Sequence, residues 1–249
     1  MSAPSIILVR PQLGENIGMV ARAMANFGLT DLRLVAPRDG WPSETARAAA
    51  SGADWVVDDA RVFPATAEAI ADLGLVLATT ARPREIAKPV VPPDEGVRRL
   101  AGRVGAGENA GVLFGGERAG LDNDDVALAE AIVTFPTDPR FSSLNLAQSV
   151  LLMGYEWFRT AGAMGGRVRP GGDKPVPIAE KADLMRLFEH LENELDESGF
   201  LHPPEKRPTM VRNLRNILLK AELTDQEVRS LRGVIKALAG RRERGEGAG

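Results

Sequence analysis

The sequence predicts an α/β protein in which helices flank a mostly parallel sheet, followed by a small all-helical module. Short apolar runs, as at residues 6–9 and 75–78, alternate along the chain with segments whose apolar residues recur at helical spacing. The runs are continuous instead of alternating with polar residues, which is typical of strands buried on both faces. The last third of the chain contains helical periodicity only, so we expect a separate helical module there.

The first predicted strand, residues 6–9, leads through a turn-rich loop into a helix with apolar residues at helical spacing. Asn16 is the expected N-cap of this helix, and Gly28 is expected to end it. Further strands are expected at residues 32–36, 54–57, 75–78, 112–114 and 131–135, and helices at residues 45–50 and 65–71.

The domain boundaries follow from changes in composition. We expect a first domain at residues 1–162, and its last helix, residues 146–158, is apolar enough to require cover from the sheet or from a partner subunit. Glycine and proline mark a linker at residues 163–177. A helical module is expected at residues 178–240, with a capping box of Thr224 and Glu227, and a disordered tail at residues 241–249.

Composition narrows the class of protein. The chain has no cysteine, which excludes disulfides and thiolate metal sites, and we expect no metal. It shows neither a signal peptide nor a run of membrane-spanning length, so we expect a cytoplasmic protein without a membrane partner. The net charge is −3, but residues 202–249 carry eleven basic and six acidic residues. That end of the chain is therefore the attractive one for a polyanion.

Three loops at predicted strand ends are the candidate ligand site, because α/β sheets bind ligands at the carboxyl ends of their strands. The first follows residue 78, the second holds Gly115, Gly116, Glu117 and Gly120, and the third runs from Phe135 to a Ser-Ser-Leu-Asn sequence. These glycines taken singly would be explained by turns alone. A glycine cluster at residues 105–111 precedes a strand instead of following one, so it is not a dinucleotide fingerprint. His190 and His202 lie outside the loops, which argues against a Ser-His-Asp hydrolase.

The motifs resemble those of the SpoU-type RNA ribose methyltransferases of the SPOUT class. The resemblance is carried by Asn16-Ile17-Gly18 with Ala21-Arg22, by Phe114-Gly115-x-Glu117-x-x-Gly120-Leu121, and by Ser143-Leu144-Asn145, in the family's order and spacing. The C-terminal part is similar to the bacterial tRNA 2′-O-methyltransferases that act on cytidine or uridine 32. That similarity lies in Glu189-His190-Leu191-Glu192, Ser198-Gly199-Phe200, Arg215 and Leu231-Arg232-Gly233. One position departs from the family, since Glu15 stands where glycine is common.

This resemblance implies a trefoil-knotted sheet domain, a homodimer, S-adenosyl-L-methionine as cofactor and tRNA as substrate. It also implies which residues form the site. The implied cofactor-binding residues are Thr79, Thr80, Ala81, Gly115, Gly120, Leu121, Phe135, Ser142, Ser143 and Leu144. The implied catalytic residues are Asn16, Arg22, Glu117, Ser143 and Asn145. Arg22 is either the proton acceptor or the group that positions phosphate and stabilises the oxyanion.

The helical module contains a group of basic residues that predicts RNA binding: Lys206, Arg207, Arg212, Arg215 and Lys220. Arg212 and Arg215 are three residues apart, so we expect them on one exposed helix face, with Met210, Leu214 and Ile217 pointing to the core. The alternative is a basic face that only meets solvent.

The sequence therefore predicts a tRNA ribose methyltransferase. The same chemistry on ribosomal RNA and a non-catalytic RNA-binding factor of the same fold are the alternatives.

Overall fold

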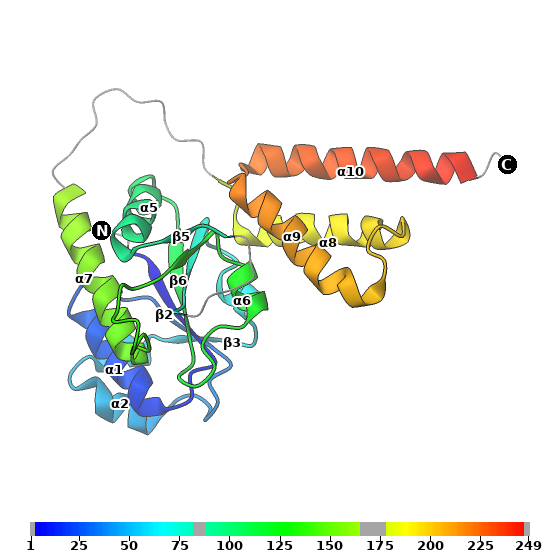
Figure 1. The fold of residues 1–249 in the computed structure, drawn as a ribbon. Helices are drawn as coiled ribbons and strands as arrows, with labels where there is room; N and C mark the ends of the chain where they lie inside the picture. The colour runs from blue at the N-terminus through cyan, green and yellow to red at the C-terminus, as the bar shows by residue number, and fades with distance from the viewer. Residues whose placement is uncertain (1–2, 82–87, 165–177, 247–249) are drawn as a thin grey trace. The chain divides into compact units, whose positions relative to one another are not determined.

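The structure is a computed structural model that describes residues 3–81, 88–164 and 178–246. The chain forms two compact units, Met1–Pro175 and Val176–Gly249. The first is an α/β domain and the second is helical (Figure 1). Among the described helices, none is long and apolar enough to cross a membrane.

The first unit is built on a seven-stranded sheet with the order β3-β2-β1-β6-β4-β7-β5, in which every described strand pair is parallel. This confirms the predicted fold class of a parallel sheet with helices. The strands are β1 (Ser5–Val9), β2 (Leu32–Val35), β3 (Arg61–Phe63), β4 (Leu75–Thr79), β5 (Val90–Val91), β6 (Ala110–Gly115) and β7 (Ala131–Val133). Because β6 pairs with both β1 and β4, the loop after β6 emerges beside the loops after these two strands.

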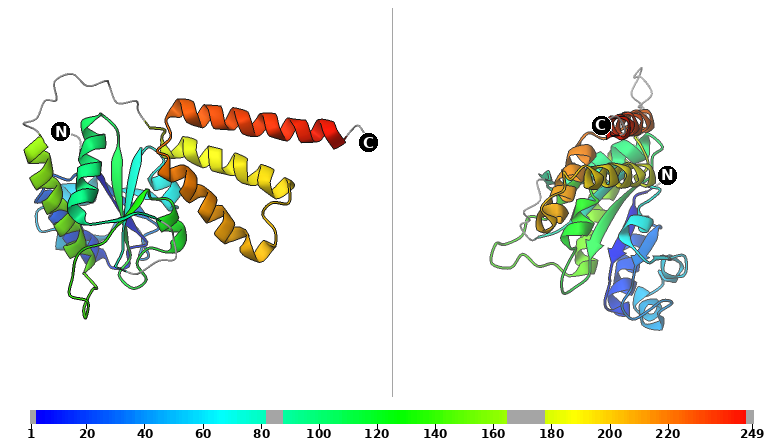
Figure 2. Two further views of the ribbon diagram at one scale, coloured as in Figure 1. Left: turned by 45° about the horizontal axis from the view of Figure 1, so that its top comes forward. Right: turned by 90° about the vertical axis from the view of Figure 1, so that its right-hand side faces the viewer.

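Helices cover both faces of the sheet. One face packs against α1 (Gly14–Ala25), α2 (Glu44–Ala50), α3 (Asp54–Asp58), α5 (Pro93–Gly105) and α7 (Leu146–Met164) through a continuous apolar core. The other face carries α4 (Thr66–Ala69) and α6 (Asn123–Ala127). Figures 1 and 2 show α5 and α7 along one side of the sheet and α6 on the opposite side.

Gly18, in the first motif, is required by packing between helices. A Cβ atom added at Gly18 would lie 2.1 Å from the carbonyl oxygen of Ala46, so α1 and α2 cross with their backbones nearly in contact. A larger residue would push the two helices apart. Glu15, where the family often has glycine, is exposed in the first turn of α1. Its carboxylate lies at the positive end of the helix dipole, which favours it there.

Two predictions about local structure in this unit are wrong. Residues 54–57 form the helix α3 and not a strand, because Val56 and Val57 are buried against the helical layer, and this packing outweighs their β propensity. Asn16 is not an N-cap, because α1 begins at Gly14 with Leu13 in the N-cap position. The prediction that Gly28 ends this helix is confirmed, because Gly28 has a positive φ of 70° and the amides of Gly28 and Leu29 donate back to the carbonyls of Ala25 at 3.3 Å and Met24 at 3.0 Å.

The second unit consists of α8 (Lys181–Glu197), the short 3-10 helix η1 (Pro204–Lys206), α9 (Arg207–Lys220) and α10 (Asp225–Glu246). Its small core is formed by Leu184, Leu187, Phe188, Leu219, Leu223 and Val228, together with Ala179. The capping box predicted at Thr224 is present. The Thr224 amide donates to Glu227 Oε2 at 2.8 Å, and the Glu227 amide donates to Thr224 Oγ1 at 3.3 Å.

The predicted orientation of α9 is wrong. Ile217 is 65% exposed, whereas Val211 and Leu219 are buried. Arg215 lies between these two at intervals of four residues, so it shares the packed face. Residues 241–246, expected in a disordered tail, continue α10, since arginine and glutamate are good helix formers. The expected tail residues 247–249 and most of the expected linker, residues 165–177, lie outside the described residues.

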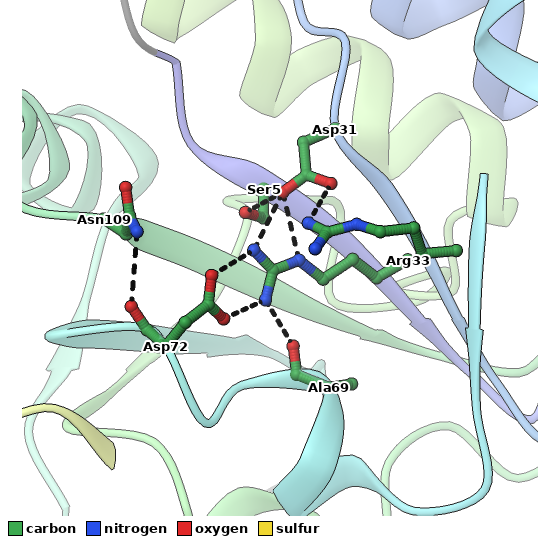
Figure 3. Close-up of polar contacts among 7 residues, drawn as sticks. Ser5, Asp31, Arg33, Ala69, Asp72 and Asn109 are labelled. Carbon is green, nitrogen blue, oxygen red and sulfur yellow. Dashed lines mark hydrogen bonds and ion pairs between the residues drawn. The ribbon is translucent and has the colours of Figure 1, made fainter. Parts of the chain in front are cut away.

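The amino ends of the strands hold a cluster of ionic side chains around Arg33 (Figure 3). Arg33 is only 3% exposed, yet its guanidinium donates to Asp31 at 3.0 Å, to Asp72 at 2.9 Å and to the carbonyl of Ala69 at 2.7 Å. Asp31 also accepts hydrogen bonds from Ser5 at 2.5 Å and from Arg61 at 2.7 Å. The cluster therefore joins the starts of β1, β2 and β3 to the segment before β4.

The two carboxylates of this cluster are held in their charged forms. Burial acts to raise the pKa of Asp31, but hydrogen bonds from Ser5, Arg61 and Arg33 more than offset it and lower that pKa. Burial likewise acts to raise the pKa of Asp72, but the hydrogen bond and the charge of Arg33 outweigh it, so the pKa of Asp72 is also lowered. The cluster is therefore a stabilising feature of the fold at neutral pH.

Candidate functional site

A cavity of about 270 Å³ opens at the carboxyl ends of β4, β6 and β7. Its size lies near the lower end of the roughly 300–1,000 Å³ common for small-molecule sites. The walls come from the three strand-end loops and from the first turn of α7. The lining residues are Thr79, Thr80, Ala81, Phe114, Gly115, Gly116, Glu117, Arg118, Gly120, Phe135, Ser142, Ser143, Leu144, Leu146 and Ser149.

The glycines after β6 form a closed turn that is also a wall of the cavity. Gly116 and Gly120 pair through a β-bridge, and the Gly120 amide donates to the Gly116 carbonyl at 2.9 Å. A Cβ atom on Gly115 would lie 2.1 Å from the carbonyl carbon of Gly120 and from the Leu121 amide. Gly120 has a φ of 68°, a conformation that favours glycine. The glycines therefore make a turn and shape the ligand site at the same time.

Glu117 connects this turn to the loop after β1. Its carboxylate accepts hydrogen bonds from the Gln12 amide at 2.9 Å, the Leu13 amide at 3.4 Å and the Asn16 side-chain amide at 2.6 Å. Asn16 is only 7% exposed, so burial and this hydrogen bond both fix its side chain. The first and second sequence motifs are thus joined through one carboxylate that also lines the cavity.

A second connection between the same two loops is made by Arg10, which has a positive φ of 51°. Its guanidinium donates to Asp122 at 2.9 Å and to Asp125, and Asp125 accepts from Thr66 at 2.7 Å. Burial acts to raise the pKa of Asp122, but hydrogen bonds from Asp125 and the charge of Arg10 lower it. The turn between Gly116 and Asp122 is therefore anchored at both ends.

Arg22 and Asn145 are not among the lining residues of the cavity, although Leu144 and Leu146 on either side of Asn145 are. Arg22 and Asn145 both line a shallow apolar hollow formed by α1 and α7 together with Met19, Ala23, Asn26, Ala147, Gln148 and Leu151. Arg22 is exposed on α1, and Asn145 precedes α7, where its Oδ1 accepts from the Ala147 amide at 2.8 Å. The residues expected to be catalytic thus divide into Glu117 and Ser143 at the cavity, Arg22 and Asn145 at the hollow, and Asn16 behind Glu117.

All but one of the residues expected to bind the cofactor line the cavity, and the exception, Leu121, is buried behind the turn. Five lining residues were not among the expected cofactor-binding or catalytic residues, although Phe114 and Gly116 lie in the motif and loop named above: Phe114, Gly116, Arg118, Leu146 and Ser149. Gly116 and Arg118 lie within the glycine turn, so their neighbours in the motif could have indicated them. Ser149 lies four residues after Asn145, one helical turn away, which is a signal that spacing could have provided.

The donors and acceptors at the cavity suit an organic ligand recognised mainly by main-chain groups. The hydroxyls of Thr79 and Thr134 donate to the carbonyls of Leu113 and Thr80, each at 2.9 Å, so they serve the fold. The glycine turn contributes backbone, and Ser142 and Ser143 contribute hydroxyls. Within residues 3–81, 88–164 and 178–246, no group of three histidine or carboxylate side chains could hold a metal ion.

The basic residues expected to bind RNA differ in their surroundings. Lys206 in η1 and Lys220 at the end of α9 are exposed, and Arg212 is half-buried. Arg207 pairs with Asp196 at 2.9 Å. Arg215 donates to Glu192 at 2.6 and 3.0 Å and stacks over the ring of Phe188, 5.5 Å from its centre. Arg215 therefore stabilises the module itself.

Comparison with known proteins identifies the family. Residues 3–155 match the SpoU rRNA Methylase family, and residues 182–248 match the C-terminal domain of the tRNA methyltransferase TrmJ. The first match covers more than half of the chain, and this chain belongs to the SpoU methylase family. The resemblance found in the sequence motifs is confirmed.

Individual relatives match over nearly the whole length. The tRNA (cytidine/uridine-2′-O-)-methyltransferase TrmJ of Salmonella typhimurium is 36% identical over 94% of this chain and 95% of its own length. The crystal structure of TrmJ from Z. mobilis ZM4 is 51% identical, with a TM-score of 0.86, and covers 95% of this chain and 99% of its own. A probable methylase from Haemophilus influenzae is 28% identical, with a TM-score of 0.62 over 96% of this chain and 97% of its own.

Proposed function

We propose that this chain transfers a methyl group from S-adenosylmethionine to a ribose 2′-hydroxyl of tRNA, at cytidine or uridine 32 of the anticodon loop. The observation that carries the proposal is the closure of three strand-end loops around one cavity, in a chain whose two units both match relatives named for this reaction. A tRNA substrate implies that the enzyme works in the cytoplasm.

S-adenosylmethionine fits the donor set of the cavity. A SpoU methyltransferase of the same fold, AviRb from Streptomyces viridochromogenes, has been solved in complex with the cofactor AdoMet. The main chain of the Gly115–Gly120 turn, residues 79–81 and the loop containing Ser142 and Ser143 would hold the cofactor. When bound, it supplies an electrophilic methyl group on a sulfonium.

The chain's own residues supply positioning and electrostatics. Glu117 holds Asn16 and the loop after β1 against the cavity wall. The Arg22 guanidinium is a permanent positive charge suited to a phosphate oxygen or to the developing alkoxide. Proton removal by Arg22 remains the alternative role. Asn145 and Ser143, two residues apart before α7, would orient the ribose.

We also propose a homodimer formed through α1 and α7. Four residues of α7, Leu151, Leu152, Tyr155 and Phe158, leave large apolar areas exposed, and Met19 of α1 adds to them. A second copy that covers this face would bury the rim on which Arg22 lies. Light scattering should give a dimeric mass for the full chain and a monomeric mass for Phe158→Glu. A monomeric mass for the unchanged chain would contradict the proposal.

The trefoil knot is likewise proposed from the family resemblance. Support comes from α7, which follows the third cavity loop and packs against both α1, which connects β1 to β2, and α5, which connects β5 to β6. Stretching single molecules of the first unit tests it. A knotted chain should reach a shorter final length than its residue count allows.

Transfer of a labelled methyl group from S-adenosylmethionine to bulk tRNA, followed by nuclease mapping, tests the main proposal. We expect one labelled ribose at nucleotide 32. Labelling of ribosomal RNA instead would favour the first alternative. Tight RNA binding without transfer would favour a non-catalytic RNA-binding factor.

We propose that the helical unit contributes phosphate contacts from Lys206, Arg207, Arg212, Arg215 and Lys220, with Lys206 and Lys220 dominant. The reason is that Lys206 and Lys220 are exposed, whereas Arg207 and Arg215 pair with carboxylates. Replacing Lys206 and Lys220 with alanine should weaken tRNA binding and reduce the slope of log K against log salt by about 1 to 2. Arg229→Ala, an exposed arginine of α10 paired with Asp225, is the matched control. Unchanged affinity in the double variant would mean that the unit is structural.

A further inference from the structure

Phe141 is the most exposed large apolar side chain among the described residues, at 77%. It lies in the loop between β7 and α7, directly before Ser142, Ser143 and Leu144, which line the cavity. Because most of the ring is in water, it adds little buried apolar area to the fold. Single exposed apolar side chains are common on protein surfaces, so it is the place of Phe141 directly before three cavity-lining residues, and not its exposure, that points to contact with something that enters there.

The loop presents this ring in a defined position. The Phe141 amide donates to the carbonyl of Asp138 at 2.9 Å, which closes a turn. Within that turn, the guanidinium of Arg140 binds the Asp138 carboxylate at 2.7 and 3.0 Å. The backbone that carries the ring is therefore held in a turn by residues 138–141.

The surroundings of Phe141 differ from those of the other exposed apolar residues near the site. Leu151, Tyr155 and Phe158 form a continuous apolar face on α7, as expected of a contact between protein subunits. Phe141 instead stands alone among Asp138, Arg140 and the serines of its loop. One aromatic face with polar and charged neighbours suits a nucleobase, which has flat apolar faces and polar edges.

We propose that Phe141 stacks on the base of the nucleotide whose ribose is methylated, a specificity contact that rests on the function proposed above. Stacking is insensitive to the group at position 4 of a pyrimidine, because every base has a π-face. The relatives are named for both cytidine and uridine, and those bases differ at that group. A site that holds the base by its face accepts both, whereas one that read the base edge by hydrogen bonds would distinguish them.

Kinetic measurements on the full chain test this contact. Phe141→Ala should lower kcat/KM for tRNA by about tenfold, through KM more than kcat, as expected for the loss of one base stack. Phe141→Tyr and Phe141→Trp should restore it, since they keep an aromatic face. The dissociation constant for S-adenosylmethionine, the melting temperature and the oligomeric mass should stay unchanged in all three. Trp55→Ala, an exposed aromatic residue on α3, is the control that should behave like the unchanged chain.

A tRNA without a base at the methylated nucleotide identifies the partner of the ring, because its 2′-hydroxyl is retained. For the unchanged chain, kcat/KM should fall about tenfold on this substrate. For Phe141→Ala it should not fall further. Equal losses in both proteins, weaker cofactor binding, or conversion of Phe141→Ala to a monomer would each overturn the proposal. If the unchanged chain methylates no tRNA, the proposed function itself fails, whereas full activity in Phe141→Ala removes only the stacking contact.

Discussion

The two edges of the central sheet use their polar groups in opposite ways. At the amino edge, Arg33 is buried and its guanidinium is surrounded by acceptors on Asp31, Asp72 and Ala69. At the carboxyl edge, the Gly115–Gly120 turn forms part of the wall of a cavity through three glycines and the two charged residues Glu117 and Arg118. At the amino edge, the charged groups find their hydrogen-bond partners within the fold. At the carboxyl edge, the loops form a cavity that can bind a ligand.

The anchoring of the carboxyl edge explains how it stays ordered without closing. Glu117 and Arg10 bind groups outside the cavity, and their hydrogen bonds connect the loop after β1 to the turn after β6. Charged side chains thus serve as supports there, while glycines form the surface itself. We therefore expect changes at the amino edge to alter stability and changes at the carboxyl edge to alter function.

The largest effect is expected for Arg22→Ala. Arg22 is exposed on α1, which starts at the carboxyl edge, and it lines the apolar hollow instead of the cavity. Methyl transfer should fall roughly 1,000-fold, as expected when a group acting on the transferred proton or its charge is lost. Cofactor affinity and melting temperature should not change. Loss of cofactor binding in a folded variant, measured by calorimetric titration, would contradict this role.

Gly115→Ala should separate function from stability at the cavity wall. The added methyl group would lie 2.1 Å from the backbone of Gly120 and Leu121, so the turn must shift. Overpacking of this kind costs about 1 to 3 kcal/mol, and we expect cofactor affinity to fall about tenfold to 100-fold. Gly102→Ala, in α5 with open space around it, is the control. This control should bind cofactor with unchanged affinity and have a slightly higher melting temperature. Equal cofactor affinity in the two variants would show that the turn does not form the binding wall.

Arg33→Met, in contrast to Gly115→Ala, should lower the stability of the fold and leave cofactor affinity unchanged. It leaves Asp72 and the Ala69 carbonyl without their partner at the amino edge. Breaking a fully buried pair costs about 3 to 5 kcal/mol. Because Asp31 and Asp72 reach solvent, we expect a loss of about 2 kcal/mol in the free energy of unfolding, and a melting temperature lower by about 6 °C. Cofactor affinity at 20 °C should be unchanged, and a changed affinity would show that the two edges are coupled.

The smallest effect is expected in how the free energy of unfolding depends on pH below neutrality. The folded-state pKa values of Asp31 and Asp72 are lowered, so their contribution to stability is present above the unfolded pKa of about 3.9. It is lost as pH falls below that value towards the folded pKa values. Urea unfolding between pH 7 and pH 2.5 should therefore show a steeper loss of stability for the unchanged chain than for Arg33→Met. Parallel curves would mean that Arg33 does not set these pKa values.

The pattern of residues along the chain was sufficient for the fold class and for the position of the cavity loops. A parallel sheet follows from continuous apolar runs separated by helical segments, since both features are local in sequence. Residues 79–81, 115–120 and 142–144 follow strands, and parallel strands bring their carboxyl ends to one edge, so their convergence on one cavity could be anticipated. The capping box at Thr224 was equally accessible, because its two partners are three residues apart.

The errors and omissions came where distant residues decide. Val56 and Val57 look like a strand by propensity, and only their burial against the helical layer makes them helical. Arg215 looks like an exposed basic residue until α9 docks with that face inward and brings it to Glu192. No sequence motif predicts the contacts among Arg10, Asp125 and Thr66, because the three residues lie in separate segments of the chain.

The sequence by itself therefore determined the strands at residues 6–9, 32–36, 75–78, 112–114 and 131–135, which strand-end loops contain the ligand-binding motifs and, through those motifs, the family. Only the tertiary structure decided which polar groups meet, with Arg33 enclosed at one edge and Glu117 bridging two loops at the other. It also placed Arg22 in the apolar hollow, whereas Glu117 and Ser143 of the other two motifs line the cavity. The physical reason is the distance along the chain over which each interaction acts. Backbone propensity and hydrophobic periodicity act within a few residues, whereas hydrogen bonds and ion pairs between side chains depend on which surfaces pack together once the chain has folded.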